Sequence, residues 1–332
     1  MSADLAGPLP VVYIRDVGTL PDTQRWLCRS LWSRSAVGVL GGPAKSYKTH
    51  LALDLAVSVA SGTPALGRFA IDDAGTALVY LAEDALPHVR ARIESLCCHR
   101  ALDIGALPLA VITSPVLRLD TARDQERLRV TVERMKPRLL VLDPLVRLHG
   151  RDENDATQIS ALLSYFRDLQ RQYDLALMLV HHTSKRQHAQ PGQSLRGSSD
   201  LHAFGDSGWY LVRQGDSVTL TVEHRSAPAP KPMAIALIAG DGADGMHLEI
   251  RDTPPVSSHE RPSELEDTVI DALRARGQPA TRKDLRSTLK INNERLGAAL
   301  CALEQRRVLI RTPAGWAIAD TADSPRMSRE TP

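Results

Sequence analysis

The 332-residue sequence has few aromatic residues: they make up 4% of the chain, and only three of them are Phe. Hydrophobic residues nevertheless reach 43%, so a core has to be built from Leu, Val, Ile and Ala. These side chains suit helices packed on a parallel sheet better than an aromatic-filled sandwich. The length is enough for one large domain and one small domain.

Cysteine is also scarce, and long apolar runs are missing. Cys28, Cys97, Cys98 and Cys301 are too few and too irregularly spaced for a disulfide framework. The adjacent pair lacks the two-residue gap that lets both thiolates reach one zinc ion. We find no signal peptide and no run of about 20 apolar residues. We therefore expect a cytoplasmic protein that does not enter a membrane, and the net charge of +2 does not by itself indicate nucleic acid.

The segment "VGVLGGPAKSYKTHLALDLAVSVASG" (37–62) has the order of a phosphate-binding loop. A short apolar run predicts a buried strand, a Gly-rich turn follows, and apolar residues at helical spacing come next. In such a turn, backbone N–H groups and the helix dipole favour an anion. The predicted nucleotide-binding residues are those of the loop and the residue after it: Gly42, Pro43, Ala44, Lys45, Ser46, Tyr47, Lys48, Thr49 and His50.

Two of these residues have predicted roles, and one departs from the pattern. Lys48 would reach the β- and γ-phosphates of ATP, and the Thr49 hydroxyl would ligate Mg²⁺. Tyr47 stands where the pattern has its last glycine. Because this position lies at the helix start, where helical geometry is open to any L-residue, we expect a reshaped but working loop. The alternative is a solvated turn before an ordinary helix.

Two further predicted strands end in acidic residues. "GTALVYLAED" (75–84) would place Glu83 and Asp84 at the carboxyl end of a strand, where open α/β sheets bind ligands. A carboxylate there could orient and deprotonate water, whereas the alternative is a helix-capping Glu. "PRLLVLDPLVRLHG" (137–150) ends its apolar run at Asp143, which would hold Mg²⁺ beside Thr49. The alternative there is a lone Asp that begins a loop.

A fourth predicted strand, within 174–186, ends in His181 and His182. Adjacent residues of a strand point to opposite faces, so the pair does not easily ligate one ion. A sensor role for one histidine near the γ-phosphate fits the strand-end position better.

Together, "GPAKSYKT", "YLAED", "LLVLDPL", "LVHHTSK" and "LRGSSDL" resemble the RecA-like ATPases of the RepA type. These are ring helicases of some plasmids and phages, related to DnaB-type replicative helicases. The resemblance covers roughly residues 30 to 225 and implies a RecA-like core, a hexameric ring and ATP bound between subunits. It also assigns roles to five residues: Lys48 and Thr49 as the Walker A pair, Glu83 as the catalytic carboxylate, Asp143 as the Walker B acid and His182 as the sensor histidine.

Such rings usually carry a Lys-x-Arg pair on a late strand that reaches the neighbour's γ-phosphate. In "SVTLTVEHRSAPAP" (217–230), Arg225 occupies the arginine place and Glu223 stands where the lysine would be. Arg225 is therefore the candidate for a finger that acts in the adjacent subunit. The alternative is an arginine at a strand end on a solvated face.

The segment 184–200 lacks apolar periodicity and is rich in Gly, Ser, Gln and basic residues, which predicts a mobile loop. In a ring it would face the central channel, where Lys185, Arg186 and Arg196 could follow the phosphates of single-stranded DNA. The alternative is a solvated surface loop.

After a Pro- and Ser-rich break, the pattern changes to three helices with Ser, Thr or Asn caps and two short strands. This order resembles a winged helix-turn-helix domain. Asn292, Asn293 and Arg295, near the start of the third helix, would then contact DNA. Basic residues only slightly outnumber acidic ones here, so protein contact is the alternative.

The predicted organisation has five parts: an N-terminal arm (1–30), a RecA-like α/β ATPase domain with a mostly parallel sheet (31–252), a linker (253–262), a winged helix domain (263–319) and a disordered tail (320–332). The predicted function is an ATP-dependent DNA motor, in its most specific form a ring-forming replicative helicase of a plasmid, phage or integrated element. The alternatives are a regulatory or recombination ATPase that binds DNA without unwinding it, and a DNA-binding regulator switched by ATP.

Overall fold

The chain consists of two compact units. The computed structural model describes residues 11–19, 21, 24–150, 156–183, 195, 199–214, 217–239, 246–251, 264–289, 291, 293–305 and 308–319. Contacts divide the chain into Met1–Pro255 and Val256–Pro332. Within the described ranges, no helix is both long and apolar enough to cross a bilayer.

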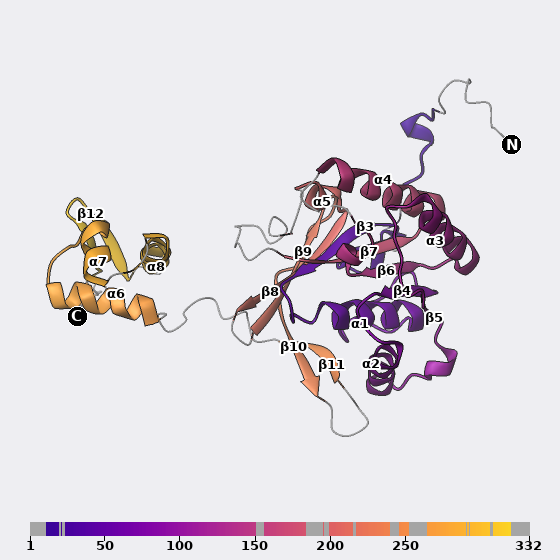
Figure 1. Ribbon diagram of the computed structural model, residues 1–332, viewed down its shortest axis with the longest axis horizontal. Helices are drawn as coiled ribbons and strands as arrows, with labels where there is room; N and C mark the ends of the chain where they lie inside the picture. The colour runs from indigo at the N-terminus through magenta and orange to yellow at the C-terminus, as the bar shows by residue number, and fades with distance from the viewer. Residues whose placement is uncertain are drawn as a thin grey trace, which may run out of the picture. The chain divides into compact units, whose positions relative to one another are not determined.

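A sheet of nine strands organises the described part of the first unit, in the order β11-β10-β9-β8-β3-β7-β6-β4-β5 (Figure 1). The six strands from β8 to β5 run parallel, and β9, β10 and β11 continue the sheet in antiparallel fashion. The bounds are β3 Val37–Gly42, β4 Ala77–Leu81, β5 Leu109–Val111, β6 Leu139–Asp143, β7 Ala176–His182, β8 Ser207–Gln214, β9 Ser217–His224, β10 Met233–Ala239 and β11 Met246–Arg251. A separate pair, β1 Trp26–Cys28 and β2 Trp32–Ser33, forms a small antiparallel sheet.

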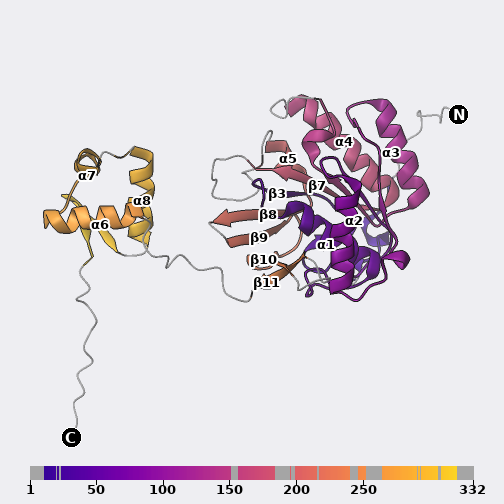
Figure 2. The same ribbon diagram turned by 60° about the horizontal axis from the view of Figure 1, so that its bottom comes forward.

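Helices cover both faces of the large sheet (Figures 1 and 2). On one face lie α1 Lys48–Ser61 and α2 Leu86–His99, and on the other lie α3 Ala122–Met135, α4 Ala156–Tyr173 and α5 Ser199–Phe204. Short 3₁₀ helices are η1 Ile14–Asp16, η3 Ile104–Ala106 and η4 Leu145–Arg147.

The central strands are buried on both faces, which explains their continuous aliphatic sequence. In β6, Leu139 and Val141 belong to the core cluster that contains α1, whereas Leu140 and Leu142 belong to the cluster that contains α3 and α4. This alternation follows from the two-residue period of a strand. The α/β core with a mostly parallel sheet, expected from the sequence, is confirmed.

The described part of the second unit contains α6 Glu264–Arg276, α7 Arg282–Leu289 and α8 Asn293–Gln305, followed by the antiparallel pair β12 Leu309–Thr312 and β13 Gly315–Ile318. Val269, Leu285 and Leu300 are among the residues of a core that this unit builds by itself. The order of elements is the one expected from the sequence, and its interpretation as a winged helix stays a prediction. Asn293 and Arg295 lie in the first turn of α8, whereas Asn292 lies outside the described residues.

Several predicted segments fall wholly or partly outside the described residues. These are the first ten residues of the N-terminal arm, the linker 253–262 and the tail 320–332. The predicted DNA-contacting residues Lys185, Arg186 and Arg196 also lie outside them.

Candidate functional site

Four of the predicted motifs meet at one edge of the large sheet, at the carboxyl ends of its parallel strands. β3 runs directly into the loop before α1, and β6 ends at Asp143. Leu81 at the end of β4 is in register with Asp143, and His182 at the end of β7 is in register with Gly42. Open α/β sheets bind their ligands at this edge.

The loop itself is tightly built around the carbonyl of Pro43. The Ser46 hydroxyl and the Lys48 ammonium both donate to this oxygen, at 2.8 and 2.6 Å, and both side chains are buried. A Cβ at Gly42 would lie 2.8 Å from Ser46 Oγ and 2.9 Å from Leu211 Cβ. The close packing at this position therefore favours glycine, and the turn brings the Lys48 ammonium back over the loop.

Tyr47 does not adopt the right-handed helical geometry expected from the sequence. Its φ of 68° and ψ of 18° are left-handed, and it is the last residue before α1. This conformation is the one that glycine adopts readily, and it costs another residue about 1–2 kcal/mol. The half-buried ring packs against the core cluster that contains α1. The contacts of the loop thus impose a glycine-like backbone on Tyr47, and ring burial offsets part of the strain.

A hydrogen bond connects the loop to β6. Thr49 Oγ1 donates to Asp143 Oδ2 at 2.7 Å, and Asp143 is 8% exposed. Burial raises the pKa of Asp143 to about 6, opposed by the Thr49 hydrogen bond and the Lys48 charge. Burial likewise lowers the pKa of Lys48, opposed by the charges of Asp143 and Glu83. A hydroxyl and a carboxylate at this distance from each other are oxygen ligands suited to Mg²⁺.

His50 follows Thr49 in the first turn of α1 and is half-buried. Burial and the nearby charge of Arg92 lower the pKa of its imidazole, against the charge of Asp84. Among the described residues, its Nε2 atom has no hydrogen-bond partner. A neutral histidine therefore flanks the loop, with a ring nitrogen still able to bond.

The two adjacent acids after β4 have different partners. Arg147 of η4 donates from Nε to Glu83 Oε1 at 2.8 Å, and both side chains are about half exposed. Asp84 pairs with Arg92 of α2 at 2.6 Å. Glu83 is thus oriented toward the segment after Asp143, whereas Asp84 is held against a helix. The sequence analysis did not anticipate Arg147, although it lies in the segment "PRLLVLDPLVRLHG", four residues after Asp143.

The histidines at the end of β7 are in different environments. His181 is buried, at 2% exposure, and His182 is half-buried. The next residue, Thr183, donates its backbone N–H to the carbonyl of Gly42 at 3.1 Å. His182 is therefore adjacent to the point where β3 passes into the loop.

Arg225 and Glu223 lie at the opposite side of the sheet from the loop, near the amino ends of the parallel strands. His224, at the end of β9, is in register with Ser207, which is in register with Gly38 near the start of β3. Four residue steps along the strand lead from Gly38 to Gly42, a rise of roughly 13 Å. Arg225 is consequently remote from its own loop, and any nucleotide it contacts would have to be bound by another subunit.

A basic residue beside the loop was not anticipated. Arg213, near the end of β8, donates from Nη1 to the carbonyl of Lys45 at 2.7 Å. β8 runs parallel to β3, so its carboxyl end reaches the same edge of the sheet. The sequence around Arg213 carries no motif, and only the strand order reveals this position.

The AAA domain family model AAA_25 matches residues 4–188, and no curated protein matches the chain. Among solved structures, a RadB recombinase is 15% identical with a TM-score of 0.47, over 66% of this chain and 92% of that one. A DnaB-like replicative helicase is also 15% identical with a TM-score of 0.47, over 64% of this chain and 57% of that one. Since the family match spans more than half of the sequence and includes the loop, Glu83 and Asp143, the chain belongs to the AAA_25 family of AAA domains.

Proposed function

We propose that this protein is a Mg²⁺-dependent ATPase that acts on DNA as an oligomer. One observation carries the proposal: buried Lys48, the Thr49–Asp143 pair and Glu83 come from three different strand ends and meet at one edge of the sheet. This combination of a lysine, a hydroxyl–carboxylate pair and a further acid is the set that nucleotide hydrolysis requires.

Each residue has a defined task in this proposal. Lys48 exchanges the Pro43 carbonyl for the β- and γ-phosphate oxygens and neutralises their charge. Thr49 and Asp143 would hold Mg²⁺, which when bound would supply positive charge that stabilises the charge developing on the phosphates. Glu83 orients the attacking water and accepts its proton. His182, next to the loop, hydrogen-bonds near the γ-phosphate and responds to its release.

The position of Arg225 supports an oligomer if this residue acts as a finger. Because this side chain is at the far edge of the sheet from its own loop, it can stabilise the transition state only in an adjacent subunit. We propose a closed ring with nucleotide at each subunit interface, and six subunits in accord with the resemblance of the five motifs. Glu223 replaces the lysine of the usual pair, so Arg225 supplies the single cation from this strand.

The most specific form of the proposal is a replicative DNA helicase of a plasmid, phage or integrated element. Lys185, Arg186 and Arg196 would follow single-stranded DNA in the channel. Asn292, Asn293 and Arg295 would give the second unit a contact to double-stranded DNA. Both contacts are predictions from the sequence motifs.

ATP turnover, with and without single-stranded DNA, tests the proposal together with strand displacement from a forked duplex. Lys48→Ala serves as the control. Turnover that DNA stimulates, accompanied by displacement and absent from Lys48→Ala, would support the helicase. Stimulated turnover without displacement would favour a regulatory or recombination ATPase, and no turnover under any condition would contradict the ATPase itself.

A further inference from the structure

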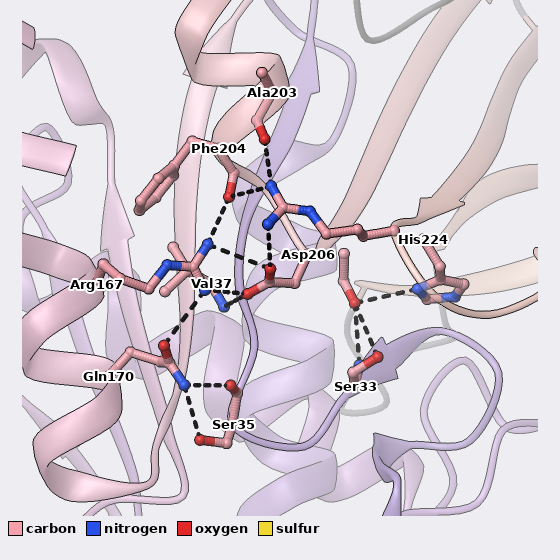
Figure 3. A network of polar contacts seen from close by, with 11 residues as sticks. Ser33, Ser35, Val37, Arg167, Gln170, Ala203, Phe204, Asp206 and His224 are labelled. Carbon is pink, nitrogen blue, oxygen red and sulfur yellow. Dashed lines mark hydrogen bonds and ion pairs between the residues drawn. The ribbon is translucent and has the colours of Figure 1, made fainter. Parts of the chain in front are cut away.

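Asp206 lies between α5 and β8 and is anchored to the first strand of the nucleotide site (Figure 3). Its backbone N–H donates to the carbonyl of Val37 at 2.7 Å. The Val37 N–H in turn donates to Asp206 Oδ2 at 3.2 Å. Because Val37 begins β3, which leads into the phosphate-binding loop, Asp206 has a fixed place in the sheet.

Two arginines from different parts of the chain converge on this carboxylate, of which Figure 3 labels Arg167. Arg167 of α4 contacts both oxygens, with Nη2 3.2 Å from Oδ1 and Nη1 bonded to Oδ2. Arg225 places its Nη1 3.5 Å from Oδ1. The Arg167 side chain is 18% exposed and that of Arg225 is 54% exposed. Arg167 is thus the buried structural partner of Asp206, whereas the more exposed Arg225 side chain can move away from Asp206.

The same two guanidinium groups cap the end of α5. Arg225 Nη2 donates to the carbonyl of Ala203 and, at 3.4 Å, to that of Phe204. Arg167 Nη2 also donates to the Phe204 carbonyl, at 2.7 Å. The last carbonyls of a helix lack partners within it and attract cations. Both terminal nitrogens of Arg225 are therefore occupied inside their own subunit.

Glu223 strengthens this contact between β9 and α5. Its Oε2 lies 2.8 Å from His202 Nε2, on the same short helix. The residue that replaces the expected lysine thus holds α5 beside Arg225. The chain at the end of β9 therefore contacts α5 through two side chains, Glu223 and Arg225.

These contacts compete with the role given to Arg225. A guanidinium binds phosphate best through two parallel N–H donors, and Arg225 cannot offer both terminal nitrogens while they bind Asp206 and α5. We propose that Asp206 is a positioning residue that retains Arg225 in a resting state, and that the finger engages only when it leaves Asp206 and the α5 carbonyls. This inference rests on the proposed function of Arg225 as a finger acting in the adjacent subunit.

Asp206→Asn in the full-length protein tests the inference and keeps the size of the side chain, although it also weakens the ion pair with Arg167. The amide oxygen can still accept from Val37, and Arg167 keeps its bond to the Phe204 carbonyl. Because the contact to Arg225 is half exposed and hence weak, we expect DNA-free kcat to rise about two- to fivefold, with KM for ATP unchanged. Adding Arg225→Ala should abolish the gain. A purely structural role of Asp206 would lower kcat instead.

Chemical modification gives a readout that does not depend on turnover. Phenylglyoxal labelling followed by peptide mass spectrometry should show faster modification of Arg225 in Asp206→Asn, with Arg213 as the internal reference. Asp271→Asn is a matched control, because it removes an Asp–Arg contact of the same 3.5 Å length in the second unit. That variant should leave Arg225 labelling and DNA-free kcat unchanged.

The outcomes separate this inference from the proposed function. If Arg225→Ala abolishes turnover while Asp206→Asn changes neither kcat nor labelling, the positioning role of Asp206 is wrong and the finger stands. If Arg225→Ala turns over ATP like the wild type, Arg225 is no finger and the inference is overturned with that assignment. Faster labelling and faster turnover together, both confined to Asp206→Asn, would support it.

Discussion

Thr49 Oγ1 and Asp143 Oδ2 are joined by a 2.7 Å hydrogen bond between residues 94 positions apart in the sequence. The bond ties the first turn of α1 to the end of β6, and it holds the two proposed oxygen ligands of Mg²⁺ at a fixed spacing. Asp143 is buried, so this bond also satisfies a carboxylate that has little access to water.

Thr49→Val removes the hydroxyl but keeps the shape of the side chain. We expect the apparent affinity for Mg²⁺ in nucleotide binding to fall about 10- to 100-fold, because one ligand is lost and the other loses its hydrogen bond. Thr49→Ser retains the hydroxyl and should stay close to wild type. Magnesium titrations with a fluorescent ATP analogue measure both variants. Equal Mg²⁺ affinities of Thr49→Val and Thr49→Ser would contradict the assignment of Thr49 as a Mg²⁺ ligand.

Tyr47→Gly and Tyr47→Ala form a second matched pair. Both remove the ring, but only glycine adopts the observed φ of 68° without strain. We therefore expect the glycine variant to exceed the alanine variant in free energy of unfolding by about 1 kcal/mol. Urea denaturation of the two variants gives this difference. Equal stabilities would mean that residue 47 does not need a left-handed backbone.

The sequence was most informative where a short aliphatic run ends in a functional residue. Such runs predicted β3, β4, β6 and β7, because buried parallel strands have a uniform composition and their carboxyl ends meet at one edge. Strand β8, which lies next to β3 inside the sheet, was not predicted, and the position of Arg213 was missed with it. Its place beside β3 depends on which strands pair, and that information is not contained in local periodicity.

Tyr47 illustrates a different limit. A rule about single residues disfavours a left-handed tyrosine, so right-handed geometry was expected. In the folded loop, Ser46 and Lys48 both bond to the Pro43 carbonyl, and this arrangement fixes the turn of the chain around residue 47. Tertiary contacts thus outweighed a local preference of about 1–2 kcal/mol. The pairings of Arg147 with Glu83 and of Arg225 with Asp206 were missed for the same reason.

Glu83→Gln tests the catalytic base. The amide cannot accept the proton of water, so we expect kcat to fall about 10²- to 10⁴-fold while nucleotide affinity stays close to wild type. Asp84→Asn is the neighbouring control, because Asp84 is held by Arg92 at 2.6 Å. Single-turnover hydrolysis measures both variants. A larger loss of kcat in Asp84→Asn than in Glu83→Gln would identify Asp84, and not Glu83, as the catalytic base.

The raised pKa of Asp143 makes stability depend on pH in a predictable direction. Burial raises this pKa from 3.8 to about 6, so between those values the folded protein retains a proton that the unfolded chain has released. The contribution of Asp143 to the free energy of unfolding is therefore fully present below pH 4. It is lost as the pH rises through 6, and the total loss is about 2–3 kcal/mol.

Asp143→Asn cannot titrate and isolates this contribution from those of other groups. In magnesium-free buffer, the unfolding free energy of the wild type minus that of Asp143→Asn should decrease between pH 4 and pH 6.5 and then level off. Saturating Mg²⁺ and nucleotide should weaken this dependence, since the bound ion favours the carboxylate. A difference that instead grows with pH would show that the folded state stabilises the charged form, and that the Lys48 ammonium and the Thr49 hydrogen bond outweigh burial.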